Sequence, residues 1–223
     1  MDTINHYVII VAGGTGKRMK SALPKQFIEI HNKPIIFHTI EKFLAADSSI
    51  HFVISLHTDF VEYWKELIEK HQFHFNHEIV TGGEERFFSV KNALEKVPQN
   101  SFVGIHDAVR PLVSVETIKA CFHTAKKEGS AIPVVDSVNS LRYVSQDKNE
   151  SLDRQYIKQV QTPQYFDAKQ IKSCYLNDYS RKFTDDASVF EATNSIVKTV
   201  EGNPENIKIT TPIDLIVARE LLK

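Results

Sequence analysis

The sequence lacks the features that mark secreted, zinc-binding and membrane-spanning proteins. Its two cysteines, Cys121 and Cys174, lie far apart and in no CxxC spacing, so neither a disulfide framework nor a zinc site is expected. It contains no run of the roughly 18 apolar residues that a membrane helix needs. The first apolar run, residues 7–12, is too short for a signal peptide. These absences predict a cytoplasmic protein that is not attached to a membrane.

A surplus of charge of one sign is also missing. The 223 residues carry 27 Lys+Arg and 28 Asp+Glu, which gives a net charge of −1. Domains that bind nucleic acid usually carry a basic surplus, because phosphate contacts dominate their affinity. We therefore expect no nucleic-acid partner, and any polyanionic ligand must meet a local cluster of cations.

Short apolar runs alternate with stretches of helical periodicity, a pattern typical of βα units in a mostly parallel sheet. Strands are expected at residues 6–12, 27–30, 51–57, 78–81, 102–105 and 195–200. Helices are expected from Pro34, after Thr58, over 87–97, from Ser114 to Gly129, over 167–176 and 186–193, and from Pro212. No repeat or linker divides the chain, so residues 1–223 are interpreted as one α/β domain.

Residues 137–158 interrupt this regularity. The strand-like run AIPVV, residues 131–135, comes before them. A second run, SLRYV, is followed by the polar stretch SQDKNES and then LDRQYIKQV, and together these segments predict an extended hairpin arm. A two-stranded arm has little core of its own, so it must pack on something else. A second subunit is the expected partner, and the arm is interpreted as a dimerisation element.

A glycine-rich loop follows the first expected strand. It reads Ala12-Gly13-Gly14-Thr15-Gly16-Lys17-Arg18-Met19, and Lys25 follows after Pro24. Glycines at the end of a strand let backbone N–H groups approach phosphate oxygens. The loop lacks the ending of a P-loop and departs from GxGxxG, so the motif alone is weak. Three cations on one loop of a nearly neutral chain favour phosphate binding over a simple tight turn.

A second glycine loop, Gly82-Gly83-Glu84-Glu85-Arg86, opens the helix expected over 87–97, with Ser89 in its first turn. Backbone groups here are able to read the edge of a base, and Ser89 adds a hydroxyl. The alternative is that Glu84 and Glu85 are only favourable charges at a helix N-terminus.

The third candidate motif, His106-Asp107-Ala108-Val109-Arg110-Pro111, follows another buried strand. A carboxylate at a strand end suits Mg²⁺, which takes one or two protein oxygens and otherwise substrate phosphates. Arg110 offers a planar fork to a phosphate. A structural Asp–Arg pair that closes a turn is the alternative, and His106 is interpreted as a neighbour.

Taken together and in order, the motifs resemble those of the 2-C-methyl-D-erythritol 4-phosphate cytidylyltransferase family of the non-mevalonate isoprenoid pathway. The shared motifs, which span nearly the whole chain, are AGGTGKRM with PKQ, GGEERFFSV, HDAVRP, DR before QTPQ, TDDAS, and NIKIT with PIDL. The resemblance implies a Rossmann-like α/β fold with an arm that completes a homodimer. It also implies Mg²⁺-dependent transfer of CMP from CTP to the sugar-alcohol phosphate.

The resemblance assigns roles by position in the shared motifs. The implied catalytic cations are Arg18, Lys25, Arg154 and Lys208, with Arg154 reaching in from the partner's arm. The implied nucleotide-binding residues are Ala12, Gly13, Gly14, Gly16, Gly83, Glu84 and Ser89. The implied acceptor contacts are Arg110, Ser137, Thr162, Thr184 and Asp185, and the implied metal ligand is Asp107. Glu84 and Glu205 stand where many members of the family have aspartate.

Three other functions remain open. Ribitol-5-phosphate cytidylyltransferases share the glycine loop, HDAVRP and QTPQ, but DR before QTPQ and TDDAS favour the erythritol enzyme. A catalytically silent nucleotide-binding relative is opposed by the intact charged residues, which are Arg18, Lys25, Asp107 and Lys208. A nicotinamide dehydrogenase needs an acidic residue at the end of the second strand, and neither Glu29 nor Glu41 fits that place.

Overall fold

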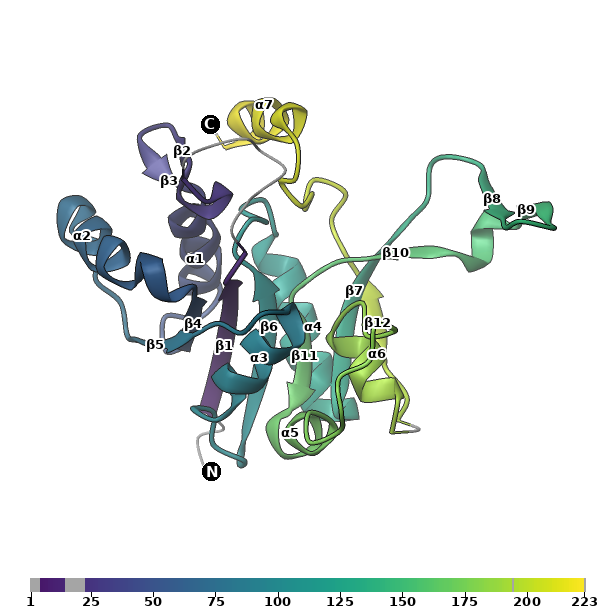
Figure 1. The fold of residues 1–223 in the computed structure, drawn as a ribbon, viewed down its shortest axis with the longest axis horizontal. Coiled ribbons are helices and arrows are strands. Elements are labelled where there is room, and N and C mark those ends of the chain that lie inside the picture. Colours follow the sequence, from purple (N-terminus) through teal and green to yellow (C-terminus); the bar gives the residue numbers. More distant parts are fainter. Residues whose placement is uncertain (1–4, 15–22, 194, 223) are drawn as a thin grey trace.

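A computed structural model describes residues 5–14, 23–193 and 195–222. These residues form an eight-stranded sheet with the order β10-β7-β11-β6-β1-β4-β5, with β12 paired to β7 (Figure 1). The strands of the sheet are β1 Asn5–Ala12, β4 His51–Leu56, β5 His77–Thr81, β6 Ser101–Asp107, β7 Ser130–Asp136, β10 Lys158–Val160, β11 Gln164–Asp167 and β12 Thr199–Glu201. The predicted strands 6–12, 51–57, 78–81 and 102–105 are confirmed.

The register of the parallel strands brings three loops to one edge of the sheet. Strand β1 pairs in parallel with β4 and β6, so that Ala12 lies beside Leu56 and Val11 lies beside Asp107. Strand β5 is parallel to β4, with Leu56 opposite Thr81. The two glycine loops and the segment after Asp107 therefore leave the sheet at the same carboxyl edge, where open α/β sheets bind ligands.

Helices cover both faces of the sheet. The helices on one face are α1 Ile35–Ala46, α2 Val61–His71 and α4 Val115–Glu128, whose core includes the fully buried Phe37, Phe43 and Trp64. The helices on the other face are α3 Arg86–Leu94, α5 Ala168–Cys174 and α6 Asp186–Glu191, which share a second core. This layering is the expected Rossmann-like α/β architecture.

Strand β11 was not predicted. It is inserted antiparallel between β6 and β7. The Tyr165 ring of β11 lies over Gly104 of β6, where an added Cβ would be 2.5 Å from the ring. Glycine is therefore required at this position because of a neighbour that lies far away in the sequence.

Smaller elements complete the chain. They are the short strands β2 Glu29–Ile30 and β3 Lys33–Pro34, the single turns Lys25–Phe27 and Thr58–Phe60, and helix α7 Pro212–Leu221. Thr211 and Asp214 form a capping box at the start of α7, so the predicted start of this helix is confirmed. The strands expected at 27–30 and 195–200 are shorter than predicted, because Phe27 ends a helical turn and residues 195–198 have no regular structure. No helix among the described residues is long and apolar enough to span a membrane.

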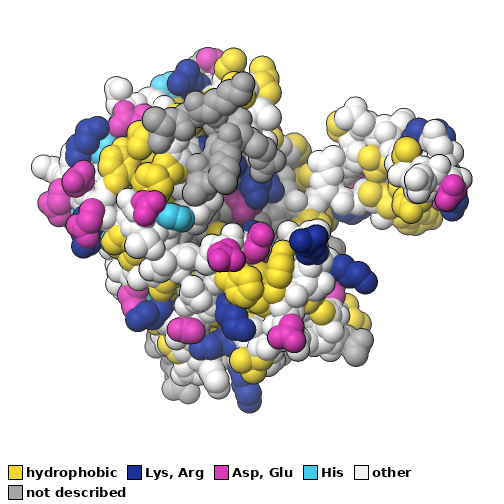
Figure 2. Space-filling model, viewed as in Figure 1, with side chains coloured by type: hydrophobic (Ala, Val, Ile, Leu, Met, Phe, Trp, Pro, Cys, Tyr) yellow, Lys and Arg dark blue, Asp and Glu magenta, His cyan; other side chains and the backbone are white. Residues whose placement is uncertain are grey.

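The predicted arm is present as a hairpin that projects from the body (Figure 1). Its strands, β8 Leu141–Val144 and β9 Asn149–Leu152, pair antiparallel and form a separate two-stranded sheet. Val138, Val144 and Tyr156 are 82%, 68% and 78% exposed. Figure 2 shows hydrophobic side chains on the surface of this projection.

Candidate active site

A cavity of about 340 Å³ opens at the carboxyl edge of the sheet. Residues from all three sequence motifs line it, together with Lys208 from the segment that precedes α7. The predicted site residues that line it are Ala12, Gly13, Gly14, Lys25, Gly83, Glu84, Ser89, Asp107 and Lys208. Segments that are far apart in the sequence therefore meet around one volume.

The two glycine loops meet at Ser89. Its Oγ accepts a hydrogen bond from the Gly83 N–H at 3.1 Å and donates to the Glu85 carbonyl at 3.2 Å. A Cβ at Gly13 would lie 3.1 Å from this oxygen, and a Cβ at Gly82 would lie 3.2 Å from it. The two loops approach this closely only because both positions are glycine.

Gln26 was missed by sequence reasoning, although it belongs to the PKQ motif. Its buried side chain donates from Nε2 to the carbonyl of Ala12 at 2.7 Å and to the carbonyl of Gly14 at 3.2 Å. Gln26, which follows the first glycine loop, therefore holds the start of that loop at Ala12 and Gly14. Nothing in the local sequence around Gln26 indicates this contact.

Three cations surround the Asp107 carboxylate. Its Oδ2 lies 3.0 Å from Lys208 Nζ and 3.2 Å from Arg110 Nε, and its Oδ1 lies 3.6 Å from Arg86 Nε. Burial opposes ionisation of Asp107, but Lys208, Arg86 and Arg110 outweigh it and hold the pKa of the carboxyl well below its usual range. Asp107 is therefore an anion at any physiological pH.

Lys25 and Lys208 are held at the same cavity by the segment before α7. Lys25 Nζ donates to the Ile209 carbonyl at 3.0 Å, and Lys208 contacts Asp107. The same segment is joined to the HDAVRP turn, since Ile209 N donates to the Val109 carbonyl at 3.0 Å. Both lysines therefore line one cavity, and their catalytic roles stay predictions.

His106 supports the turn and does not face the cavity. Its Nδ1 lies 3.0 Å from Thr162 Oγ1, and its Nε2 lies 3.3 Å from the Arg110 carbonyl. Complete burial lowers the pKa of His106 to about 3, so the ring is neutral. Thr162 Oγ1 also accepts from the Asp107 N–H at 3.2 Å, so this hydroxyl holds the backbone of Asp107 in place.

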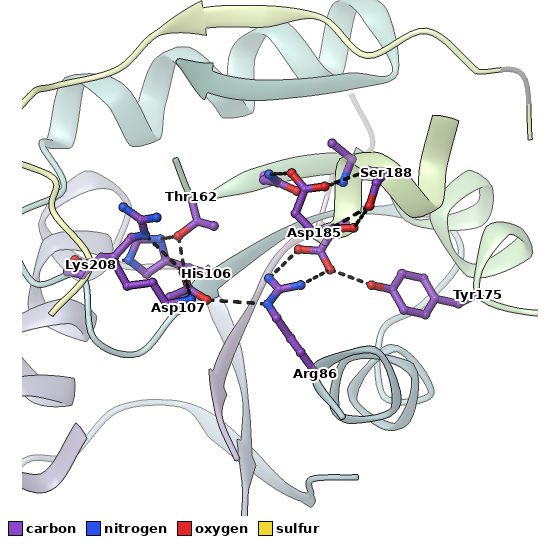
Figure 3. Close-up of polar contacts among 12 residues, drawn as sticks. Arg86, His106, Asp107, Thr162, Tyr175, Asp185, Ser188 and Lys208 are labelled. Atoms are coloured by element: carbon purple, nitrogen blue, oxygen red, sulfur yellow. Dashed lines mark hydrogen bonds and ion pairs between the residues drawn. The ribbon is translucent and has the colours of Figure 1, made fainter. Parts of the chain in front are cut away.

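The two adjacent aspartates of the TDDAS motif have different roles in the structure. Asp185 caps α6, with its Oδ1 accepting from Ser188 N at 2.9 Å. Asp186 is fully buried and forms a bidentate pair with Arg86 at 2.8 and 2.6 Å (Figure 3). The acceptor contact implied for Asp185 stays a prediction, while Asp186 is the aspartate that connects to the cavity wall.

Several implied residues lie away from the cavity in this single chain. Arg154 donates from Nη1 to the Val138 carbonyl at 2.8 Å, within the arm. Ser137 is buried where the arm leaves the body, and Thr184 is exposed before α6. Their roles stay predictions. Gly16 and Arg18 lie outside the described residues.

The described residues contain no cluster of three or more His, Cys, Asp or Glu side chains arranged for a metal. Asp107, Glu84 and Glu85 are among the residues that line the cavity, and both oxygens of Asp107 face cations. Mg²⁺ commonly takes one or two carboxylates, several waters and substrate phosphates. The described lining offers carboxylates of this kind but no protein cage, so a Mg²⁺ ion here would be held largely by the phosphates of a bound nucleotide.

These features define the class of protein. A mostly parallel sheet has two glycine loops at its carboxyl edge, and Lys25, Lys208 and Asp107 line the cavity there. No Ser–His–Asp or Cys–His arrangement surrounds the cavity among the described residues. Such a site acts by binding and neutralising phosphates, as expected of a nucleotidyltransferase.

Comparison with known proteins identifies the family. Residues 6–223 match the family model described as IspD: 2-C-methyl-D-erythritol 4-phosphate cytidylyltransferase. A relative of that name from Phocaeicola vulgatus is 46% identical over 98% of this chain and 100% of its own, and one from Bacteroides fragilis is 48% identical over 96% and 98%. The chain belongs to the 2-C-methyl-D-erythritol 4-phosphate cytidylyltransferase family.

Solved structures agree with this assignment. The 4-diphosphocytidyl-2C-methyl-D-erythritol synthase of Anaerococcus prevotii superposes with a TM-score of 0.84 at 28% identity, over 98% of this chain and 96% of its own. The 2-C-methyl-D-erythritol 4-phosphate cytidylyltransferase of Francisella tularensis gives a TM-score of 0.78 at 30% identity, over 97% and 99%.

Proposed function

We propose that this chain transfers CMP from CTP to 2-C-methyl-D-erythritol 4-phosphate and releases pyrophosphate, as a step in isoprenoid precursor synthesis. The observation that carries the proposal is that Lys25, Lys208 and Asp107 line one cavity with both glycine loops, and that Lys208 contacts Asp107 there. Family membership supports the choice of CTP and of the acceptor.

The reaction joins two negatively charged groups. An oxygen of the acceptor phosphate forms a bond to the α-phosphorus of CTP, and the bond from that phosphorus to the pyrophosphate oxygen breaks. The acceptor phosphate is already ionised near neutral pH, so no side chain needs to remove a proton. Lys25 and Lys208 offset the repulsion and hold the groups in line, since positioning and electrostatics carry phosphoryl-type transfer.

The glycine loops supply the binding surface for the nucleotide. Gly13, Gly14 and Gly83 leave backbone groups accessible at the cavity wall, and Ser89 keeps the two loops in register. Asp107 would hold Mg²⁺ together with the phosphates of CTP. When bound, the metal would supply further charge neutralisation at those phosphates.

The arm is proposed to complete a homodimer. It leaves Val138, Val144 and Tyr156 exposed, and a hairpin of this size buries little on its own. In a dimer, Arg154 would be delivered to the partner's cavity, where it would contact the acceptor phosphate. A monomer that keeps full turnover at every concentration would contradict this arrangement.

The reaction is proposed to take place in the cytoplasm. Cys121 and Cys174 are both buried free thiols, as is common in reducing compartments. CTP, the proposed donor, is a charged cytoplasmic metabolite.

The test is a panel that measures pyrophosphate release. CTP, UTP, GTP and ATP are each paired with 2-C-methyl-D-erythritol 4-phosphate or ribitol 5-phosphate, with and without Mg²⁺. Release with CTP, the erythritol phosphate and Mg²⁺ is expected. Release with ribitol phosphate alone would reassign the acceptor, and CTP binding without any release would identify a silent nucleotide-binding protein.

A further inference from the structure

Arg86 lies between two carboxylates that belong to different parts of the fold. It is the first residue of α3, and its side chain lines the cavity. On one side its Nη1 and Nη2 bind both oxygens of Asp186, at 2.8 and 2.6 Å. On the other side its Nε lies 3.6 Å from Asp107 Oδ1 (Figure 3). Arg86 therefore links the buried start of α6 to the carboxylate at the centre of the site.

Asp186 is anchored from behind. Its side chain is fully buried, and its Oδ1 also accepts a hydrogen bond from the Tyr175 hydroxyl at 2.6 Å. The Tyr175 ring stacks on Phe87 with 4.7 Å between the ring centroids. A bidentate pair to an anchored carboxylate fixes both the position and the plane of the guanidinium. Arg86 is therefore held rigidly although it borders an open cavity.

The two carboxylate oxygens of Asp107 face different cations, and the Arg86 guanidinium is one of them. Oδ1 faces Arg86, while Oδ2 contacts Lys208 and Arg110. Asp186 balances the charge of Arg86. Arg86 therefore orients Asp107 while leaving the Asp107 carboxylate available to pair with Lys208. With asparagine in place of Asp186, the charge of Arg86 would lose its partner. The guanidinium would then turn toward Asp107 or toward bound phosphates.

On the basis of the proposed function, we infer that Tyr175, Asp186 and Arg86 form a positioning chain for the transfer reaction. Tyr175 holds Asp186, Asp186 holds and neutralises Arg86, and Arg86 keeps Asp107 turned so that Lys208 and Arg110 face the reacting phosphates. When the positioning chain is broken, the Arg86 guanidinium is free to contact a bound triphosphate. This contact strengthens binding of the triphosphate in the ground state. Turnover falls, since only interactions that are stronger in the transition state raise it.

Two tyrosine variants test this inference as a matched pair. Tyr175→Phe removes the hydroxyl that holds Asp186 and keeps the ring. Tyr165→Phe removes an equally buried hydroxyl that lies 2.8 Å from His6 Nε2, at the opposite edge of the sheet. Both should lower the melting temperature to a similar extent. Tyr175→Phe should lower kcat by about fivefold or more with the KM for CTP unchanged or lower, while Tyr165→Phe keeps kcat within about twofold.

Asp186→Asn gives the stronger perturbation. It should lower kcat by about tenfold or more, again without raising the KM for CTP. Equal kcat values for Tyr175→Phe and Tyr165→Phe, or a higher KM with kcat unchanged, would assign the chain a purely structural role and overturn the inference.

A crystal structure of Asp186→Asn separates this inference from the proposed function. If the wild type releases no pyrophosphate, the proposed function fails. A displaced Asp107–Lys208 contact in the variant would still support the positioning chain, and an unchanged contact would overturn it. If Asp186→Asn does not fold, the Tyr175→Phe crystal gives the same comparison.

Discussion

The two edges of the central sheet use buried polar groups in opposite ways. At the carboxyl edge, Asp107 is surrounded by cations that border an open cavity. At the amino edge, His6 of β1 is bonded to Asp47 on one side and to Tyr165 on the other, at 2.9 and 2.8 Å, and its ring stacks on Phe122. The charged groups around Asp107 are accessible to a ligand. The polar groups of His6 are hydrogen-bonded to other side chains of the protein.

The pKa shifts of Asp107 and His6 differ in the same way. At the carboxyl edge, neighbouring cations overcome burial and hold the pKa of Asp107 low, so that charge is retained. At the amino edge, burial lowers the pKa of His6 more than Asp47 raises it, so that the neutral form is favoured. Substitutions at the carboxyl edge should therefore change turnover, and substitutions at the amino edge should change stability.

The largest effect is expected for Lys25→Ala. Removing one preorganised cation from the reacting phosphates should lower kcat by about 10²- to 10³-fold, roughly 3–4 kcal/mol in the barrier. Steady-state pyrophosphate release measures the loss, and thermal unfolding checks that the fold is retained. Lys33→Ala is the matched control, because Lys33 pairs with Glu41 outside the cavity. Full turnover in Lys25→Ala would remove Lys25 from the mechanism.

Much of the carboxyl edge was predictable because its signals are local. Each glycine loop directly follows an apolar strand, and parallel strands place their ends at one edge. The convergence of Lys25 and Lys208, which are widely separated in the sequence, depended on family resemblance. No spacing rule connects the segment before α7 to the first glycine loop.

The contacts that sequence reasoning missed are long-range. The sequence predicts a site role for Asp185 and none for Asp186. A pair of adjacent aspartates gives no information about which carboxylate contacts an arginine in another motif. Strand β11 was missed because its antiparallel insertion depends on pairing with β6 and β7. The fit of Tyr165 over Gly104 depends on that same pairing.

Gly104→Ala should produce an intermediate effect and should separate the two edges. The new Cβ would lie 2.5 Å from the Tyr165 ring, so the ring must shift, which disturbs the contact of its hydroxyl with His6. Overpacking of this kind typically costs about 1–3 kcal/mol. Urea unfolding should show that loss in the free energy of unfolding, while kcat stays within about twofold well below the melting temperature. A fall in kcat of more than about twofold, measured well below the melting temperature, would show that the two edges are coupled.

The smallest effect concerns the pH dependence that His6 gives to stability. Burial keeps the pKa of His6 below its value in the unfolded chain, so the unfolded state takes up more protons as the pH falls through about 6.5. The contribution of His6 to stability is therefore complete above that pH and declines below it. Between pH 7.5 and 5.5 the wild type should lose more stability than His6→Asn, by at most about 1.4 kcal/mol. Urea unfolding of both proteins at the two pH values measures this difference. An equal or smaller loss in the wild type would show that His6 is not held in its neutral form.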